Sequence, residues 1–558
     1  MPTIEISLHD LNNLVGKHFT EKELEKALEY VKGEIEDRDG DRLKIEIADT
    51  NRPDLWSIEG IARELRSRFG KEKGIPKYEI KKPSMKVIVD KNLEGIRPKT
   101  VCAVVRGLNI TEEVLFQMIQ LQEKVCETFG RKRKEVALGV YDYHKIKPPI
   151  YYKAYKPRDI KFVPLEFSEE MHLDEILQRH PKGKEYAHLL KGKKMYPIFM
   201  DSSGQVLSMP PIINSDYTGK VTTETKDVFI ECSGFDLKYL IPALNIMVSA
   251  LADRGGKIES VEVVYPDGKI VTPDLTPKKI EIDVNYLKSL TGLDLSLAKI
   301  KDLLEKSRYD VIVKKEKIAV CHPAYRQDVM HQVDVIEDLI ITYGYNNIEP
   351  IIPKISSKGE LTEINNFVKK VTEIMIGLGG QEIMSYTLTN KDDLLIKMNL
   401  NENEMKVIEV DSPVSKNWSV FRTWIIPNLI EFLGKNTHRE YPQQIFEIGE
   451  VVVYDEKAET KARNPVRLAW ALADKDANFT KAKQALNFIM RNLGLNYEIE
   501  SIEHNSFING RVGRISVNGK KVAYMGEIHP QVLENFGIEM PVCAFELNLS
   551  DLLELLKK

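Results

Sequence analysis

The chain has 558 residues, enough for about four domains that each bury a core of their own. Its 42% hydrophobic and 29% charged content is that of an ordinary soluble protein, and the net charge of -4 argues only against a surface coated in positive potential. The five cysteines form no C-x-x-C pair, so neither a disulfide framework nor a zinc site is expected. Without a signal pattern or a run of 18 apolar residues, we expect a cytoplasmic protein with no membrane partner.

Residues 1–80 predict an N-terminal α/β domain, because strand-like and helix-like segments alternate from Thr3 to Phe69. The loop Asn51–Leu55 places a proline and an acid at the start of a helix, where both are favoured. The segment Lys71–Pro83, which is rich in Lys, Pro and Gly, predicts a linker.

Residues 85–255 predict a second domain, with apolar strands at Val101–Val105 and Val136–Val140 and an amphipathic helix at Glu112–Phe129. Four consecutive cations, Arg131-Lys132-Arg133-Lys134, follow that helix. Cations at a helix C-terminus are usually dipole partners on a solvated surface, and contact with phosphate is the alternative.

Two segments of this domain, Val206–Ser215 and Asp227–Gly234, mix strand formers with small polar residues at breaks, where strand-end sites tend to lie. No Ser-His-Asp or Cys-His set is evident, so the residue types give no support to nucleophilic hydrolysis. Their polar residues either form a site or satisfy backbone groups at strand ends. The candidates are Ser208, Asn214, Glu231 and Ser233.

Residues 274–348 predict a compact unit of helices near Asn285–Leu290 and Ser296–Ser307, a hairpin from Val311 to Val320, and an acidic helix. The same order of helices and hairpin also fits a winged-helix nucleic-acid binder. The carboxylates of the acidic helix would repel phosphate from it, however.

Four acids stand out around this last helix. Asp334, Glu337 and Asp338 fall at i, i+3 and i+4, which places them on one side of a helix, and Asp328 could join them only from a bend at the helix start. Oxygen ligands with nothing softer nearby suit Mg²⁺. The alternative is a solvated acidic face with Asp328 as the N-cap.

Residues 355–558 predict a last domain with an amphipathic helix at Glu363–Leu378 and buried strands at Val407–Asp411 and Gln444–Ile448. Glycine-rich phosphate motifs are absent, and no Arg follows Phe446-Glu447-Ile448-Gly449 directly to grip an ATP phosphate. Glu527 and His529 are either an acid/base pair or metal ligands, or interface and turn residues.

Several of these segments, in this order, resemble phenylalanyl-tRNA synthetase beta subunits. Pro323–Asp328, Asp334–Asp338 and Tyr343–Tyr345 are similar to the family's P-S-Y-R-x-D, D-L-I-E-E and Y-G-Y signature. The other similar segments are Asn51–Leu55, Ser57–Arg63, Asp411–Ser415, Phe421–Thr423, Tyr441–Val451, Phe507–Arg511 and Gly526–Pro530.

The resemblance implies a multidomain α+β fold. Residues 85–255 would be an editing domain, residues 274–348 a helix and hairpin domain with an acidic magnesium cluster, and residues 355–558 a class II synthetase-like antiparallel sheet without catalysis. Because the chain lacks an early oligonucleotide-barrel insertion and a C-terminal anticodon domain, we expect the archaeal or eukaryal form.

The resemblance also implies a function as the beta subunit of phenylalanine–tRNA ligase. Its partners would be tRNA(Phe) and an alpha subunit that binds ATP and phenylalanine, in a heterotetramer of two alpha and two beta chains. It implies Mg²⁺ held by Asp328, Asp334, Glu337 and Asp338, and hydrolysis of mischarged Tyr-tRNA(Phe) at Ser208, Asn214, Glu231 and Ser233. At the positions of Glu231 and Ser233 the archaeal pattern commonly has Asp and Thr, respectively.

Two other functions compete with this interpretation. One is a free-standing aminoacyl-tRNA hydrolase, and the other is a structural or RNA-binding subunit whose editing pocket is inactive.

Overall fold

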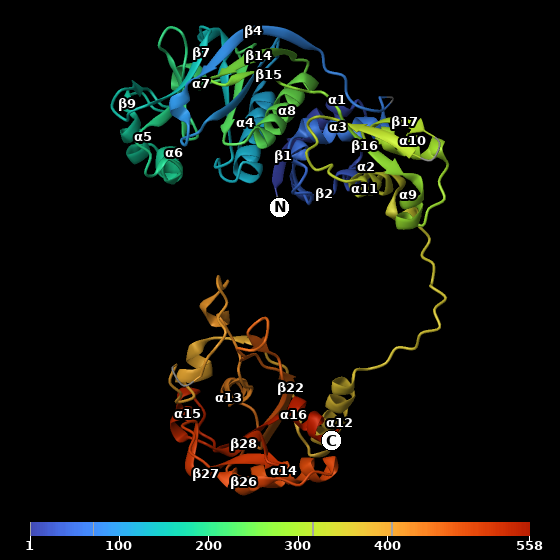
Figure 1. Ribbon diagram of the computed structural model, residues 1–558, viewed down its shortest axis with the longest axis vertical. Helices are drawn as coiled ribbons and strands as arrows, with labels where there is room; N and C mark the ends of the chain where they lie inside the picture. Colours follow the sequence, from blue (N-terminus) through green and yellow to red (C-terminus); the bar gives the residue numbers. More distant parts are fainter. Residues whose placement is uncertain (1, 71, 315–316, 403–404, 558) are drawn as a thin grey trace. The chain divides into compact units, whose positions relative to one another are not determined.

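The computed structural model describes residues 2–70, 72–314, 317–402 and 405–557. The chain forms two compact units, Met1–Ile352 and Pro353–Lys558 (Figure 1).

The N-terminal unit begins with a small antiparallel sheet covered by helices. The sheet has the order β1 (Thr3–Ser7), β3 (Arg42–Ile47), β2 (Gly33–Asp39). Alternation along β3 buries Leu43, Ile45 and Ile47 against the helices. The helices are α1 (Leu8–Val15), α2 (Glu21–Leu28) and α3 (Ile58–Phe69), the last capped by the Ser57 hydroxyl.

A ten-stranded sheet forms the centre of this unit, and its two edge strands, β12 and β6, matter most for the site. The order is β12 (Ile213–Asn214), β11 (Val206–Met209), β10 (Tyr196–Met200), β7 (Ile150–Tyr155), β4 (Ile80–Val89), β14 (Lys257–Tyr265), β5 (Lys99–Arg106), β13 (Val228–Gly234) and β6 (Val136–Asp142), with β15 (Gly268–Thr272) paired to β14.

The linker predicted at Lys71–Pro83 is wrong at its C-terminal end, because strand β4 already begins at Ile80. The pairing of β4 with β14 is interrupted between Lys81 and Met85, and Pro83 lies in that interruption. Proline is tolerated at a bulge because no ladder hydrogen bond is needed from it there.

Helices α4 (Glu112–Lys124) and α8 (Leu237–Asp253) cover one face of the large sheet (Figure 1). The predicted helix Glu112–Phe129 has the right extent, but its last residues, Val125–Phe129, form a π-helical turn. A separate group of short elements packs beside β10–β12. It contains β8 (Lys161–Phe162), β9 (Met171–His172), α5 (Leu173–Arg179), α6 (Pro181–Tyr186) and α7 (Asp216–Gly219).

Buried and half-buried ion pairs join the N-terminal domain to α8. Arg254, just after α8, contacts Asp10 and Glu59 at 2.7 Å each, and Arg63 of α3 contacts Asp253 at 2.7 Å. These contacts fix the two domains against each other within one unit.

The helix and hairpin module predicted after residue 274 is confirmed. Its core includes Leu303 and Leu304 from one helix and Val335 and Leu339 from the acidic helix. The turn of the predicted hairpin falls on residues 315–316, which lie outside the described residues. The elements are β16 (Lys278–Asp283), α9 (Val284–Thr291), α10 (Leu297–Lys306), β17 (Asp310–Lys314), β18 (Lys317–His322) and α11 (Gln332–Tyr343), with the sheet order β16-β18-β17.

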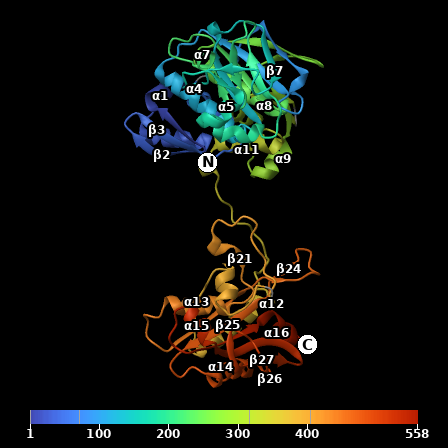
Figure 2. The ribbon, with the colours of Figure 1, turned by 90° about the vertical axis from the view of Figure 1, so that its left-hand side faces the viewer.

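The C-terminal unit is built on a seven-stranded sheet that is antiparallel except where β19 joins it (Figure 2). Its order is β19 (Gln381–Glu382), β22 (Gln443–Glu450), β25 (Val466–Ala473), β29 (Val542–Asn548), β28 (Lys520–Ile528), β27 (Phe507–Val517), β26 (Glu498–Ser501).

Helices pack on the two faces of this sheet in two separate cores. On one face are α12 (Glu363–Gly377), α14 (Phe479–Leu493) and α16 (Leu549–Leu556), and on the other are α13 (Ile426–Lys435) and α15 (Pro530–Asn535). The amphipathic helix predicted at Glu363–Leu378 and the buried strand at Gln444–Ile448 are confirmed.

Two small ribbons, β20 (Leu388–Thr389) with β21 (Val420–Phe421) and β23 (Val453–Tyr454) with β24 (Ala462–Arg463), flank the second face. The buried strand predicted at Val407–Asp411 is wrong. That segment pairs with β21 through a single bridge between Glu409 and Val420, and its residues are half-buried or exposed, so it forms neither a regular strand nor a buried one.

Candidate functional site

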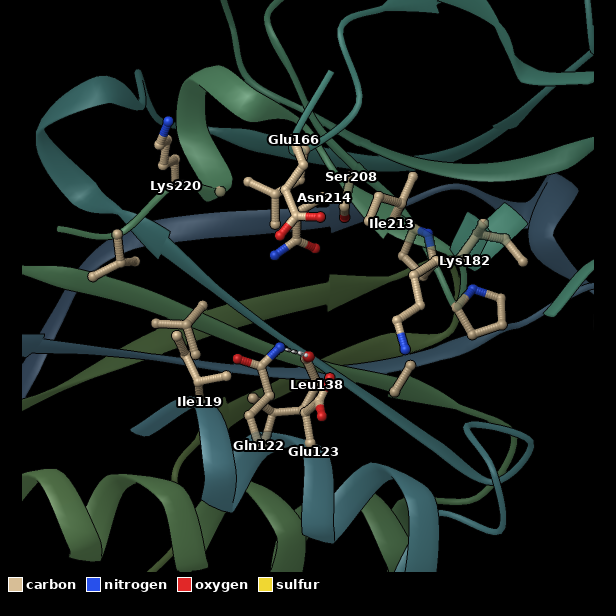
Figure 3. Close-up of a pocket in the computed structure, with 18 of the residues that line it drawn as sticks. Ile119, Gln122, Glu123, Leu138, Glu166, Lys182, Ser208, Ile213, Asn214 and Lys220 are labelled. Carbon is tan, nitrogen blue, oxygen red and sulfur yellow. Dashed lines mark hydrogen bonds between the residues drawn. The ribbon is translucent and has the colours of Figure 1, made fainter. Parts of the chain in front are cut away.

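A cavity of about 360 Å³ lies between the two edges of the large sheet and helix α4 (Figure 3). Strand β6 and helix α4 form one wall, and the β11–β12 hairpin forms the opposite wall. This volume is typical of a site for a small molecule or a single side chain. The lining is apolar for the most part, with Leu138, Val140, Ile212 and Ile213 among its residues.

Three of the four candidates from the editing segments lie on the wall of this cavity. Ser208 and Asn214 face each other in the pairing of β11 with β12, and Glu231 comes from β13, next to the edge strand β6. Ser208 and Glu231 are 1% and 2% exposed, so their polar groups are removed from bulk water. The structure thus brings three of the four residues together, and their role in editing stays a prediction.

Tyr141, at the end of β6, holds this cluster together. Its hydroxyl oxygen lies 2.8 Å from Ser208 Oγ, 3.1 Å from Glu231 Oε1 and 3.3 Å from Asn214 Oδ1. The hydroxyl thus links strands β6, β11, β12 and β13, and with them the two edges of the sheet. Sequence reasoning missed Tyr141 because it ended the strand at Val140, and nothing in the local pattern marks this tyrosine as different from a core residue.

The carboxyl of Glu231 has a strongly raised pKa. Burial raises its pKa to about 8, although the hydrogen bond with Tyr141 and the positive charge of Arg97 act in the opposite direction. Its second oxygen, Oε2, is buried without a hydrogen-bond partner. At neutral pH the group is therefore mostly a neutral carboxylic acid, which can donate one hydrogen bond and accept others.

Ser233, the fourth candidate, does not line the cavity. It is fully buried and its hydroxyl accepts a hydrogen bond from Arg97 Nε at 3.1 Å. Arg97 is itself 2% exposed and also donates to the Lys134 carbonyl at 3.2 Å. Ser233 therefore lies behind the cavity wall, where it holds Arg97 near Glu231.

The four acids of the predicted magnesium cluster have separate partners. Arg326 Nη2 contacts Asp328 Oδ2 at 2.6 Å and Asp338 Oδ2 at 2.9 Å. Asp334 accepts the backbone N–H groups of residues 330 and 331, and Glu337 contacts Lys32 at 2.9 Å. Asp328 precedes the helix, which begins at Gln332, and is linked to Asp338 of the helix through Arg326.

In this arrangement the four acids do not fit a magnesium ion, because a guanidinium already occupies the space between two of them. Burial alone would raise the pKa of Asp328, but Arg326 and Arg52 outweigh it and lower that pKa to about 2. Within the described ranges, no three Asp, Glu, His or Cys side chains are grouped so that they could hold a metal ion. The shared magnesium site stays a prediction.

Comparison with known proteins decides the family. Sequence models match the B3/4 domain at residues 77–244, the tRNA synthetase B5 domain at 280–345 and the Phenylalanyl tRNA synthetase beta chain CLM domain at 348–549. The phenylalanine–tRNA ligase beta subunit of Pyrococcus abyssi is 52% identical over 556 residues, which span 99% of this chain and 100% of that protein. The chain belongs to the phenylalanine–tRNA ligase beta-subunit family.

More distant relatives and a solved structure agree. The beta subunit of Archaeoglobus fulgidus is 41% identical over 551 residues, 99% of this chain and 98% of its own. An N-terminal fragment of the phenylalanyl-tRNA synthetase beta-subunit from Pyrococcus horikoshii is 52% identical. It superposes with a TM-score of 0.60, covering 62% of this chain and all of the fragment. The family predicted from the sequence motifs is confirmed.

The remaining acid/base candidates of this beta subunit have structural roles. Glu527 accepts the backbone N–H of Phe479 at 2.9 Å and pairs with Arg511 at 2.6 Å, while His529 caps α15 by accepting the N–H of Gln531. Across the ranges described above, no helix has the length and apolar character needed to span a membrane.

Proposed function

We propose that this beta subunit acts with an alpha-subunit partner in a heterotetramer of two alpha and two beta chains. In this complex the alpha subunit binds ATP and phenylalanine and charges tRNA(Phe). We further propose that the cavity of the N-terminal unit hydrolyses mischarged Tyr-tRNA(Phe). Family membership supports the first proposal, and the chemistry of the cavity supports the second.

The observation that carries the editing proposal is the buried Glu231 with an unpartnered oxygen on the wall of a largely apolar cavity. Tyrosine and phenylalanine differ by one hydroxyl. An apolar pocket rejects the extra hydroxyl poorly, whereas a site with placed polar groups selects it strongly, because the analogue without it leaves those groups unpaired. A tyrosine ring in this cavity would give the free oxygen of Glu231 a partner, and a phenylalanine ring would not.

In the hydrolysis that we propose, a water molecule attacks the ester, and no side chain of the cavity acts as the nucleophile. Water attacks the carbonyl carbon, the bond from that carbon to the ribose oxygen breaks, and a proton passes to the ribose oxygen. Ser208 has no base to activate it, because His180, the histidine of the cavity wall, has both ring nitrogens engaged with backbone groups of residues 165 and 182. The cavity residues thus select and orient the substrate.

The C-terminal unit supports the assignment of adenylation to the partner. Its Glu447 carboxylate is buried and bound to Arg422 at 2.6 Å, and no Arg follows Gly449 to hold an ATP phosphate. We expect the purified chain alone to show no phenylalanine-dependent ATP–pyrophosphate exchange above a mock preparation.

Deacylation of Tyr-tRNA(Phe) by the assembled complex tests the editing proposal. Glu231→Gln keeps the shape of the side chain but cannot exchange the proton, and we expect it and Glu231→Ala to lose most of the deacylation while charging with phenylalanine persists. Glu259→Gln is a matched control, since Glu259 is a buried glutamate of the same sheet that pairs with Arg106 instead. Absence of deacylation in the wild type would favour a structural subunit with an inactive pocket.

Copurification separates the complex from a free-standing hydrolase. We expect the chain to copurify with a second synthetase subunit from the source lysate. Recovery of an active deacylase with no second subunit would favour the hydrolase.

A further inference from the structure

The four cations Arg131–Lys134 form a left-handed turn between the π-helical segment and β6, which we call the basic turn. Its first three residues have φ values of +50°, +52° and +63°. Residues with side chains visit this region singly and not in runs, so the conformation needs support from the surroundings. Backbone hydrogen bonds supply it: Lys132 donates to the Glu127 carbonyl and Arg133 to the Cys126 carbonyl, both at 2.9 Å.

Arg133 joins the basic turn to the wall of the cavity. Its Nη1 donates to the carbonyl oxygens of Pro211 and Ile212 at 3.3 and 2.9 Å, and its guanidinium lies 4.3 Å from the centre of the Tyr186 ring. Pro211 and Ile212 line the cavity, and so does Arg133 itself. The turn is therefore fixed at the rim of the site.

A second link connects the other end of the turn to the polar cluster. Arg97 donates to the Lys134 carbonyl at 3.2 Å and to the Ser233 hydroxyl at 3.1 Å, and both Arg97 and Ser233 are buried. The position of the turn is thus coupled to the residues around Glu231.

The other three side chains of the turn, Arg131, Lys132 and Lys134, are exposed. In the described part of the chain none of them forms an ion pair, whereas Arg158 and Arg179 of the same domain each contact a carboxylate. A rigid, strained backbone that presents three unpaired cations beside a cavity is poorly explained as a solvated helix end. It suits a binding site for several negative charges.

We propose that the basic turn binds backbone phosphates of the RNA strand that carries the aminoacyl ester into the cavity. This inference rests on the proposed editing function. A cavity of about 360 Å³ holds little more than the aminoacyl group, so the nucleotides before the terminal ribose must lie outside its rim, where the turn presents its cations. The cavity walls themselves carry both signs, with Lys182 and Lys220 beside Glu123, Glu166 and Asp216, so the unpaired cations of the basic turn are the positive group that carries the proposal (Figure 3).

The test is the variant Arg131→Gln/Lys132→Gln/Lys134→Gln, which leaves the anchoring Arg133 in place. The matched control is Lys191→Gln/Lys193→Gln/Lys194→Gln, an exposed basic loop of the same domain that does not line the cavity. In deacylation of Tyr-tRNA(Phe) by the assembled complex, we expect KM to rise about tenfold or more in the turn variant, with kcat within about twofold of wild type, since remote phosphate contacts bind the substrate without touching the reacting bond.

Binding of uncharged tRNA(Phe) to the full chain over a range of salt concentrations gives a readout that does not depend on editing. Each phosphate contact on a single strand contributes roughly 0.7 to the slope of log K against log salt, so the turn variant should lose about 2 from the slope. The charge-conserving variant Arg131→Lys/Lys132→Arg/Lys134→Arg should keep both the KM for deacylation and the salt slope of tRNA binding at their wild-type values.

An unchanged slope in the turn variant, or an equal loss in the control loop, would overturn the inference. If the wild type binds tRNA through the turn but deacylates nothing, the editing proposal fails while the binding site stands. A thermal unfolding curve for each variant excludes loss of fold as the cause.

Discussion

Gly139 lies directly opposite Glu231 in the pairing of β6 with β13, and its missing side chain gives the Tyr141 hydroxyl its place. A Cβ atom at position 139 would lie 2.2 Å from that hydroxyl oxygen, closer than any van der Waals contact allows. The polar cluster therefore depends on a small residue that carries no chemistry of its own.

Gly139→Ala should displace the Tyr141 ring and separate Ser208 from Glu231. We expect Tyr-tRNA(Phe) deacylation to fall at least tenfold and stability to drop by about 1–3 kcal/mol, as in other overpacked sites. Deacylation by the complex and urea unfolding of the chain measure the two effects. Full editing by the alanine variant would show that the cluster does not need the hydroxyl where it stands.

Tyr141→Phe removes the hydroxyl and keeps the ring. Because the hydrogen bond with Tyr141 lowers the pKa of Glu231, its loss should raise that pKa further and shift the basic limb of the deacylation profile to higher pH. Tyr265→Phe is the control, since Tyr265 packs in the same core but its hydroxyl accepts from the Thr100 N–H and donates to the Thr100 carbonyl instead of contacting Glu231. A profile that moves equally in both variants would argue for a general loss of packing.

Glu231 should also make the stability of the chain depend on pH. Its pKa is raised from an unfolded value of 4.5 to about 8, so the folded state binds the proton more tightly. The wild type should be most stable at low pH and should lose stability as the pH rises from about 5 to about 8, because the carboxyl ionises freely in the unfolded chain while burial keeps it protonated in the folded chain. The free energy of unfolding of Glu231→Gln, relative to wild type, should increase over the same interval in urea melts. A constant difference would mean that Glu231 is ionised in the folded chain.

The sequence predicted the helices, the hairpin module and the candidates on β11, β12 and β13 because these depend on local periodicity and on residue types at strand breaks. It could not predict Tyr141 or Gly139, whose roles arise only when the two edges of the sheet approach each other. The same limit applies to Pro83, since a bulge opposite β14 is a property of the pairing and not of the segment itself.

The acidic helix shows a different limit. The spacing of Asp334, Glu337 and Asp338 on one helix side is visible in the sequence, but the position of Arg326 is not. Arg326 stands two residues before Asp328 and folds back on it, and Lys32 reaches Glu337 from a domain 305 residues away in the chain. Carboxylates grouped by spacing were thus divided among separate cationic and backbone partners by tertiary contacts.

Arg326 should be more important than magnesium for the stability of the isolated chain. It is 2% exposed and contacts both Asp328 and Asp338, so Arg326→Met would leave Asp338 without this cation and Asp328 with the more distant Arg52, at 3.9 Å. Removing one partner of a buried ion pair typically costs about 3–5 kcal/mol, and we expect a loss of that order in urea unfolding. Arg158→Met, at an exposed ion pair of the same unit, should change stability by less than about 1 kcal/mol.

Chelation provides the complementary measurement. Because Arg326 already neutralises Asp328 and Asp338, EDTA should leave the unfolding curve of the wild-type chain unchanged, and added Mg²⁺ should not raise its midpoint. A ligand that binds only the folded chain would raise the midpoint with its concentration. If Mg²⁺ stabilises the wild type, and Glu337→Ala removes that effect, then the ion displaces Arg326 from Asp328 and Asp338 and is bound by the four acids.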